Sequence, residues 1–197
     1  MQTILVTGER AVGKSTLLQR LVQTRFSHYN MTKIPDFYGV VTRTTRTPAE
    51  KERTIYAQLL PDREEVILAS TCAQTSFLLS GPRLGPFQFS QSACDKANHR
   101  LVNGSGDIAV IDEIGPLELV HQAGFWPGLS ATLITRNTLV AVVRPDLVSQ
   151  LSVLLERHRP AGGLSIYRLE STETAESVLP RIVDQIAVVQ GSRAREK

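Results

Sequence analysis

The octapeptide Gly8-Glu9-Arg10-Ala11-Val12-Gly13-Lys14-Ser15 fits the pattern G-x-x-x-x-G-K-[ST]. An apolar, β-prone run, Gln2-Thr3-Ile4-Leu5-Val6-Thr7, leads into the glycines, and residues 16–22 carry leucines at helical spacing. The pattern and its surroundings together predict a strand, a glycine-rich turn and the first turn of a helix. This unit decides the fold of the chain.

The turn has the chemistry of a phosphate-binding loop. Glycines let successive backbone N–H groups point at phosphate oxygens, and the following helix adds its positive N-terminal end. Lys14 can reach the β- and γ-phosphates of a nucleotide, and Ser15 can ligate Mg²⁺. The alternative is a plain glycine turn with a solvated Lys14, which the flanking strand and helix disfavour. The predicted nucleotide-binding residues are Gly8, Glu9, Arg10, Ala11, Val12, Gly13, Lys14, Ser15 and Thr16.

Length and composition fit an ordinary folded protein. The chain has 197 residues, of which 42% are hydrophobic and 21% charged. We expect one domain over residues 1–190, followed by a polar, basic tail over residues 191–197. The 22 basic and 19 acidic residues give a formal net charge of +3, and both signs are interspersed. This distribution indicates solubility and argues against a nucleic-acid partner.

The cysteines and the hydropathy of the chain indicate its redox state and its cellular location. Cys72 and Cys94 lack the spacing of a metal finger, so we expect free thiols. The chain opens on its first strand instead of a charged and apolar leader, and its longest apolar run is Leu139-Val140-Ala141-Val142-Val143. A cytoplasmic protein without a membrane span is therefore expected.

Strand and helix patterns alternate at both ends of the sequence. Helices are predicted over residues 14–25, 90–102, 117–121, 129–135, 145–158 and 173–189. Besides the first strand, strands are predicted over residues 37–42, 107–113, 138–143 and 164–169. Short β-prone segments too closely spaced for helical crossovers lie at residues 54–60, 66–70, 77–79 and 87–89, after a polar loop or wide hairpin at 43–53. The predicted fold class is α/β, with a mostly parallel, doubly wound sheet and a short antiparallel extension.

Two carboxylates close the run Asp107-Ile108-Ala109-Val110-Ile111-Asp112-Glu113. If this is a parallel strand, Asp112 reaches the sheet edge where the phosphate-binding loop lies, because ligands bind where such strands end. We predict that Asp112 holds Mg²⁺ opposite Ser15, directly or through water. Glu113 is the candidate for activating a water in line with the γ-phosphate. The competing interpretation is a pair of helix-capping acids.

Arginines can neutralise charge that builds up on a transferred phosphoryl group. Arg144 directly follows the strand 138–143, so it should project from the active edge, whereas Arg136 precedes this strand and should lie at the far edge. Arg43 and Arg46 are expected on the loop after the strand 37–42. For each arginine, a solvated surface position is the competing interpretation. The candidate catalytic residues are Lys14, Glu113, Arg46 and Arg144.

Glu118 is ambiguous in the sequence. It lies two residues after Pro116, in the first turn of a predicted helix. Any acid is favoured there by the helix dipole, so a structural and a functional role stay equally open.

With both carboxylate and phosphate motifs in place, the chain resembles the small P-loop nucleoside-triphosphatases, a family of stand-alone nucleoside-triphosphate phosphatases. The most specific match is Val110-Ile111-Asp112-Glu113-Ile114-Gly115-Pro116-Leu117-Glu118, which is similar to the family's extended Walker B, D-E-I-G-x-x-E. Residues 39–46, which begin Gly39-Val40-Val41-Thr42, are similar to its G-F-x-T-x-E-V-R strand and loop. Arg53 is similar to an arginine that follows in the family.

The resemblance implies the P-loop NTPase fold and Mg²⁺-dependent hydrolysis of nucleoside triphosphates, among them ATP and GTP, to the diphosphate and phosphate. Several positions depart from the family pattern, and the glycines that usually surround the arginine similar to Arg53 are missing here. Ala11 stands where a glycine is usual, Glu9 brings a negative side chain to the loop, and Thr45 replaces an acid before Arg46.

Two other functions fit parts of the same pattern. A kinase of a nucleotide or small metabolite would use the same phosphate machinery but needs an acceptor pocket and usually an arginine-rich lid. A switch or assembly module would use nucleotide to order a loop that a partner reads. The guanine-reading pattern N-K-x-D of signalling GTPases is absent from the sequence.

Overall fold

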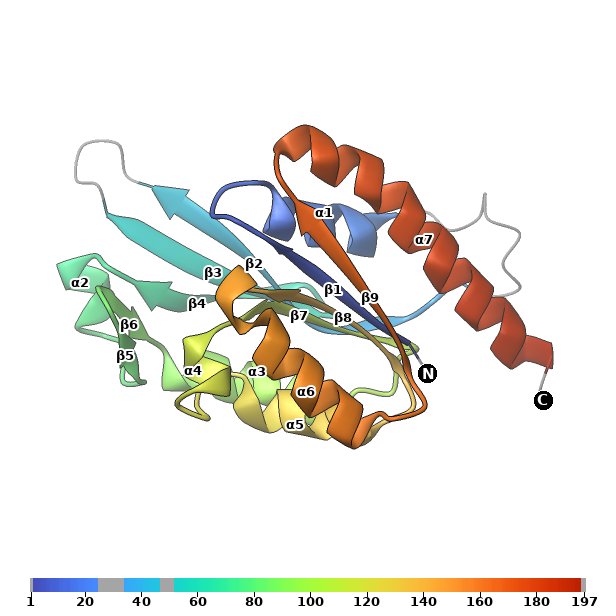
Figure 1. The fold of residues 1–197 in the computed structure, drawn as a ribbon. Helices are drawn as coiled ribbons and strands as arrows, with labels where there is room; N and C mark the ends of the chain where they lie inside the picture. Colours follow the sequence, from blue (N-terminus) through green and yellow to red (C-terminus); the bar gives the residue numbers. More distant parts are fainter. Residues whose placement is uncertain (1, 25–33, 47–51, 196–197) are drawn as a thin grey trace.

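A nine-stranded sheet forms the centre of the computed structural model, which describes residues 2–24, 34–46 and 52–195 (Figure 1). The strand order across the sheet is β5-β6-β4-β3-β2-β7-β8-β1-β9. The strands are β1 (Gln2–Gly8), β2 (Phe37–Arg46), β3 (Arg53–Leu60), β4 (Glu64–Ser70), β5 (Arg83–Leu84), β6 (Phe87–Phe89), β7 (Ile108–Ile114), β8 (Thr138–Val143) and β9 (Gly163–Leu169).

The sheet has a parallel part and an antiparallel extension, which confirms the predicted fold class. β1 runs parallel to β8 and β9, and β7 runs parallel to β8 and β2. β3, β4, β6 and β5 continue from β2 in antiparallel pairs. The closely spaced β-prone segments therefore add to one edge of the parallel sheet instead of forming crossover units.

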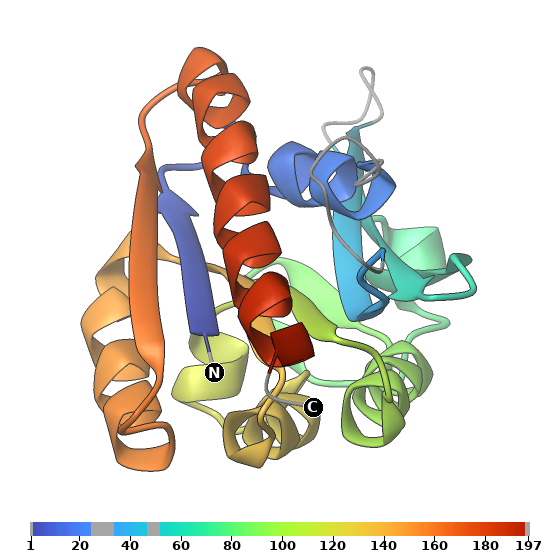
Figure 2. The ribbon, with the colours of Figure 1, turned by 90° about the vertical axis from the view of Figure 1, so that its right-hand side faces the viewer.

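Helices cover both faces of the sheet. They are α1 (Lys14–Gln23), α2 (Ala73–Ser76), α3 (Gln91–Asn103), α4 (Pro116–Leu119), α5 (Trp126–Ile134), α6 (Val148–His158) and α7 (Thr172–Arg195), with a 3₁₀ turn η2 (Pro145–Leu147) before α6. α1 and α7 lie on one face, and α3, α5 and α6 lie on the other (Figures 1 and 2). None of the helices in the described ranges is both long and apolar enough to cross a bilayer.

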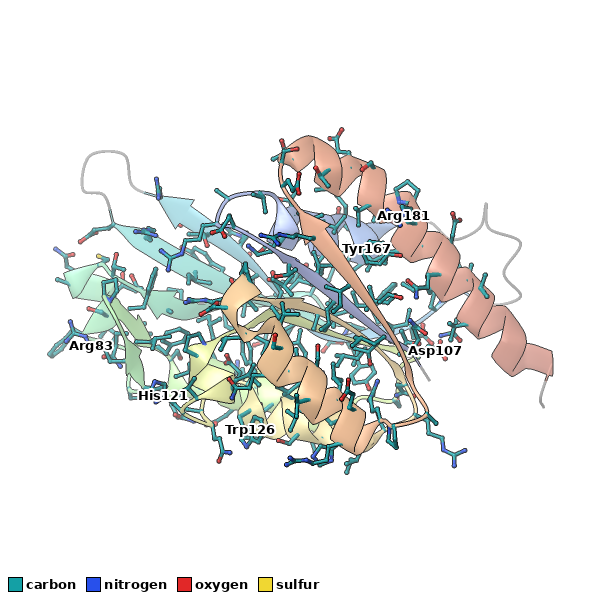
Figure 3. All side chains as sticks on the ribbon, viewed as in Figure 1. Arg83, Asp107, His121, Trp126, Tyr167 and Arg181 are labelled. Atoms are coloured by element: carbon teal, nitrogen blue, oxygen red, sulfur yellow. The ribbon has the colours of Figure 1, made fainter. Side chains whose placement is uncertain are left out.

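The two hydrophobic cores follow from strand alternation. In β1, Ile4 and Val6 pack with the leucines of α1 and the apolar residues of α7, whereas Leu5 packs on the opposite face with residues of α3, α5 and α6. At the margin of the first core, the Arg181 guanidinium of α7 lies 5.2 Å from the centre of the Tyr167 ring of β9 (Figure 3). The central strands are buried on both faces, which is why they read as continuous apolar runs.

Several predicted boundaries are wrong. β2 extends to Arg46 and pairs with β3, so of the two alternatives predicted for residues 43–53 the wide hairpin is confirmed and the loop is wrong for Arg43 to Arg46. Residues 47–51 lie outside the described residues. Residues 77–79, predicted as strand, form a turn after α2, with Phe77 87% exposed. α7 continues to Arg195, so residues 191–195 are helical instead of a separate tail. Apolar or polar composition alone does not reveal whether a neighbouring strand is available for pairing.

Gly39 in β2 makes a specific stability prediction. Its φ of 115° disfavours any side chain, and a Cβ there would lie 2.2 Å from the carbonyl oxygen of Val110 in β7. We expect Gly39→Ala to lower the free energy of unfolding by about 2–5 kcal/mol, from backbone strain and overpacking together. Gly85→Ala is the matched control, because Gly85 has a φ of 56° but no atom within 4 Å of the added Cβ. If denaturant unfolding showed the same loss of unfolding free energy in Gly39→Ala and Gly85→Ala, the close approach of β2 to β7 would be contradicted.

Candidate active site

The loop between β1 and α1 has the backbone that its glycines permit. Gly8 ends β1 with a φ of 147°, and Gly13 caps α1 with a φ of 91°. Ala11 also has a positive φ, 65°, at the position where the family pattern usually has glycine. A left-handed conformation costs a non-glycine residue about 1–2 kcal/mol, so the chain accepts strain to keep the loop shape.

Lys14 lies inside this loop. Its side chain is almost buried, and Nζ donates to the carbonyl oxygens of Gly8 at 2.7 Å and Glu9 at 2.6 Å. The side chains of Glu9 and Arg10 are exposed. The ammonium is therefore held over the segment whose N–H groups are predicted to bind phosphates.

Asp112 is fully buried between the loop helix and β2. Its Oδ1 accepts a hydrogen bond from Ser15 Oγ at 3.1 Å, and its Oδ2 accepts two from Thr42, from the backbone N and from Oγ1, both at 2.9 Å. Burial raises the pKa of the Asp112 carboxyl to about 6, although these hydrogen bonds oppose the shift. One carboxylate oxygen is thus saturated by the protein, and the other faces the Ser15 hydroxyl.

A bulge in β7 explains how two consecutive residues serve one site. Between Ile111 and Ile114 the register with β8 shifts, so that three steps on β7 correspond to two on β8. Asp112 and Glu113 occupy this irregular stretch. Asp112 turns inward, and Glu113 stays one-third exposed, with Oε1 3.5 Å from Arg144 Nε at the end of β8. Arg144 therefore lies beside Glu113 at the carboxyl end of β8, and its catalytic role stays a prediction.

Glu118 has a structural role. The side chain is 3% exposed, and its two oxygens accept hydrogen bonds from the backbone N of Gly115 at 2.9 Å and of Phe125 at 3.1 Å. It thereby caps α4 and ties the segment after Glu113 to the start of α5. Burial raises the pKa of Glu118 to about 7, against the opposing effect of these N–H groups.

This raised pKa predicts a pH dependence of stability. Because the pKa in the folded state exceeds the unfolded value, the contribution of Glu118 is fully present below about pH 4.5 and is lost as the pH rises through about 7. The shift corresponds to about 3 kcal/mol. Between pH 4.5 and 8, the free energy of unfolding of wild type, measured with urea, should fall by about 3 kcal/mol relative to that of Glu118→Gln. A pH-independent difference between the two proteins would contradict the burial of the charge; exposed Glu170→Gln is the control.

Arg46 lies away from Glu113, whereas Thr42 contacts Asp112. Arg46 is exposed and lies four residues beyond Thr42, about 13 Å along an extended strand, so it is not brought to Glu113 in this structure. Its catalytic role stays a prediction. Thr42, conversely, was not expected in the site, although it ends the Gly39-Val40-Val41-Thr42 stretch that resembles the family. Only its pairing position beside β7 reveals the contact with Asp112.

The donor set suits Mg²⁺. A serine hydroxyl and a carboxylate oxygen are hard oxygen ligands, which this ion prefers. Within the described ranges, no group of three or more His, Cys, Asp or Glu side chains forms a metal cage. Mg²⁺ usually takes few protein ligands and completes its shell with phosphate oxygens and water, so a two-residue site fits it.

The comparisons with known proteins decide the family. The sequence pattern described as NTPase matches residues 3–183. The chain belongs to this family. Its reaction is the hydrolysis of nucleoside triphosphates, which confirms this part of the predicted function. The requirement for Mg²⁺ stays a prediction.

One related protein and two solved structures are similar to this NTPase. The nucleoside-triphosphatase THEP1 of Methanosarcina acetivorans is 28% identical over 147 residues, 73% of this chain and 76% of the relative. The crystal structure of THEP1 from the hyperthermophile Aquifex aeolicus covers 94% of this chain and 99% of its own, with a TM-score of 0.59 and 20% identity. The solution structure of a human cancer-related nucleoside triphosphatase covers 94% and 97%, with a TM-score of 0.64 and 20% identity. At this identity the two structures support the fold, and the P-loop NTPase fold is confirmed.

Proposed function

We propose that this NTPase requires Mg²⁺ held by Ser15 and Asp112, and that Glu113 activates the attacking water. The observation that carries this proposal is the grouping at one sheet edge of the Ser15–Asp112 contact and the Glu113–Arg144 pair. All four residues stand at the carboxyl ends of parallel strands or at the N-terminus of α1, where ligands of doubly wound sheets bind.

Each residue has one role in the proposed mechanism. The loop N–H groups and Lys14 bind the β- and γ-phosphates, and Ser15 and Asp112 bind the metal. Mg²⁺, when bound, neutralises charge on the phosphate oxygens. Glu113 accepts the proton of the water that attacks the γ-phosphorus, and Arg144 swings from Glu113 toward the phosphoryl oxygens as they gain charge. Arg46 is a second candidate for stabilising the charge on these phosphoryl oxygens.

We further propose that the base of the nucleotide is not strongly selected, so that ATP, GTP and their deoxy forms are all substrates. The named contacts of the loop go to phosphates, which all triphosphates share. The base-reading pattern N-K-x-D is absent from the sequence. The cytoplasmic location and the absence of a nucleic-acid partner stay predictions.

Steady-state phosphate release across the common NTPs and dNTPs tests this function. With saturating Mg²⁺ we expect kcat/KM values within about tenfold of one another, a difference of about 1.4 kcal/mol in transition-state stabilisation, because all triphosphates share the phosphate contacts. With EDTA in place of Mg²⁺, release should fall to the background of the Lys14→Ala variant. Full activity in EDTA would refute the metal site, and a single active nucleotide would refute the broad specificity.

A further inference from the structure

A cavity of about 140 Å³ opens beside Glu113 on the face of the sheet that α3 covers. Three of its lining residues, Ser15, Glu113 and Arg144, belong to the hydrolytic site, and the Glu118 carboxylate, held by two backbone N–H groups, also lines it. Its apolar lining is formed by Ile55, Leu68, Leu84, Phe89, Leu117 and Phe125. Cavities of roughly this volume with apolar walls hold one benzene-sized ring. Neither phosphate binding nor water activation uses the apolar part.

The strand pairing shows what lies beyond the apolar part. Thr44 of β2 pairs with Ile55 of β3, and both line the cavity. The next pair on the same face of the sheet is Arg46 with Arg53, because side chains return to one face every second residue. This pair is displaced by about 7 Å along the strands. The face of the sheet that lines the cavity therefore carries two arginines just beyond it.

These arginines stand opposite each other on neighbouring strands. Directly opposed like charges on neighbouring strands are destabilising. Neither Arg46 nor Arg53 forms an ion pair with a carboxylate of the described residues, whereas Arg43, on the other face of β2, is paired with Glu65 at 2.6 Å. The Arg53 guanidinium instead lies 5.8 Å from the centre of the Phe87 ring, on the face that Phe89 shares. An anion between the two arginines would relieve the repulsion.

We propose that this cavity binds a second small molecule, an organic anion with an apolar or aromatic body and a hydroxyl donor at its far end. The anionic group meets Arg46 and Arg53, the body fills the space between Ile55, Leu68 and Phe89, and the hydroxyl donates to the Glu113 carboxylate. The last contact rests on the role proposed above for Glu113. The occupant takes the place of the attacking water, so its binding slows phosphate release.

The probe is 4-(hydroxymethyl)benzoate, and benzyl alcohol is the matched compound without the carboxylate. Binding is measured by ligand-observed NMR titration without nucleotide, so it does not depend on catalysis. We expect a millimolar Kd for the benzoate and at least tenfold weaker binding of benzyl alcohol. With ATP and Mg²⁺ present, the benzoate should lower kcat for phosphate release with little change in KM for ATP. Equal binding of both compounds, or none, would overturn the proposal.

Variants locate the binding. Arg53→Gln should weaken the benzoate about tenfold and leave benzyl alcohol unchanged. Arg83→Gln is the control: Leu84 faces the cavity, so its neighbour Arg83 points outward from β5 (Figure 3), and affinity should stay at the wild-type value. Cys94→Leu and Thr44→Leu each fill part of the cavity and should abolish binding of both compounds, and a cooperative thermal transition shows that each variant is folded. Wild-type affinity in Arg53→Gln or in both filling variants would contradict the site. Because Glu113→Gln is assayed separately by phosphate release, failure here leaves the hydrolytic assignment standing.

Discussion

Glu113→Gln is expected to lower kcat for NTP hydrolysis by about 10²–10⁴-fold, the usual contribution of a positioned general base. Glutamine keeps the size of the side chain and can still lie near Arg144, but it cannot accept the proton of the attacking water. Nucleotide affinity should change less than about threefold, because the phosphates are bound by the loop N–H groups and Lys14. The variant therefore separates binding from chemistry.

Phosphate release and the Kd for a fluorescent nucleotide are measured on the same preparation. Glu170→Gln serves as the control, since Glu170 is exposed and follows β9 at the same edge of the sheet. Unchanged phosphate release by Glu113→Gln would remove the water-activation role. Loss of nucleotide binding would instead mean that Glu113 contributes to the ground-state site.

Asp112→Asn is expected to act in opposite directions on activity and stability. Asparagine can keep the contacts, with its carbonyl oxygen accepting from Thr42 and its amide donating to Ser15 Oγ. Hydrolysis should fall about 10²–10³-fold, because a neutral amide binds Mg²⁺ poorly. The free energy of unfolding in EDTA at pH 8 should stay equal or rise by about 1–3 kcal/mol, because the variant removes a fully buried charge.

Urea unfolding in EDTA and phosphate release at increasing Mg²⁺ measure the two effects. Partial recovery of activity at high Mg²⁺ would agree with a weakened metal ligand. A variant that is both less stable and inactive would show that the Asp112 charge supports the fold through Thr42 and Ser15. Activity equal to wild type at low Mg²⁺ would exclude Asp112 as a metal ligand.

The motifs that could be predicted are those whose residues are adjacent in the sequence and lie in the same site. Gly8 to Ser15 forms one turn, and its backbone geometry follows from its own glycines. Asp112 and Glu113 are adjacent, and Arg144 directly follows a strand of unmistakable apolar pattern. For such residues, knowing that parallel strands end at one edge is enough to place the side chains together.

The residues that were missed depend on pairing between distant segments. The polar stretch Arg43 to Arg46 becomes strand because β3 pairs with it. Its two threonines favour a strand, but its polar composition fits a loop as well, so composition alone does not decide. Phe77 has the composition of a strand, yet it has no partner strand and lies exposed in a turn. Thr42 joins the site only because β2 lies beside β7.

The cavity is the clearest case of information that local patterns lack. Ile55, Phe89 and Phe125 come from three separate segments, and each alone reads as an ordinary core residue. Glu118, likewise, could be placed at a helix start from the sequence, but its burial and its bond to Phe125 come from the chain reversal before α5. The functional residues at this edge of the sheet can therefore be predicted only in part from local sequence patterns.

A crystal structure with Mg²⁺ and a non-hydrolysable NTP analogue tests the central claim most directly. We predict that the γ-phosphate lies between Lys14 and the Glu113–Arg144 pair, with the metal on Ser15 Oγ and on Asp112 directly or through one water. A γ-phosphate turned away from Glu113, or a metal bound without Ser15 and Asp112, would contradict the account.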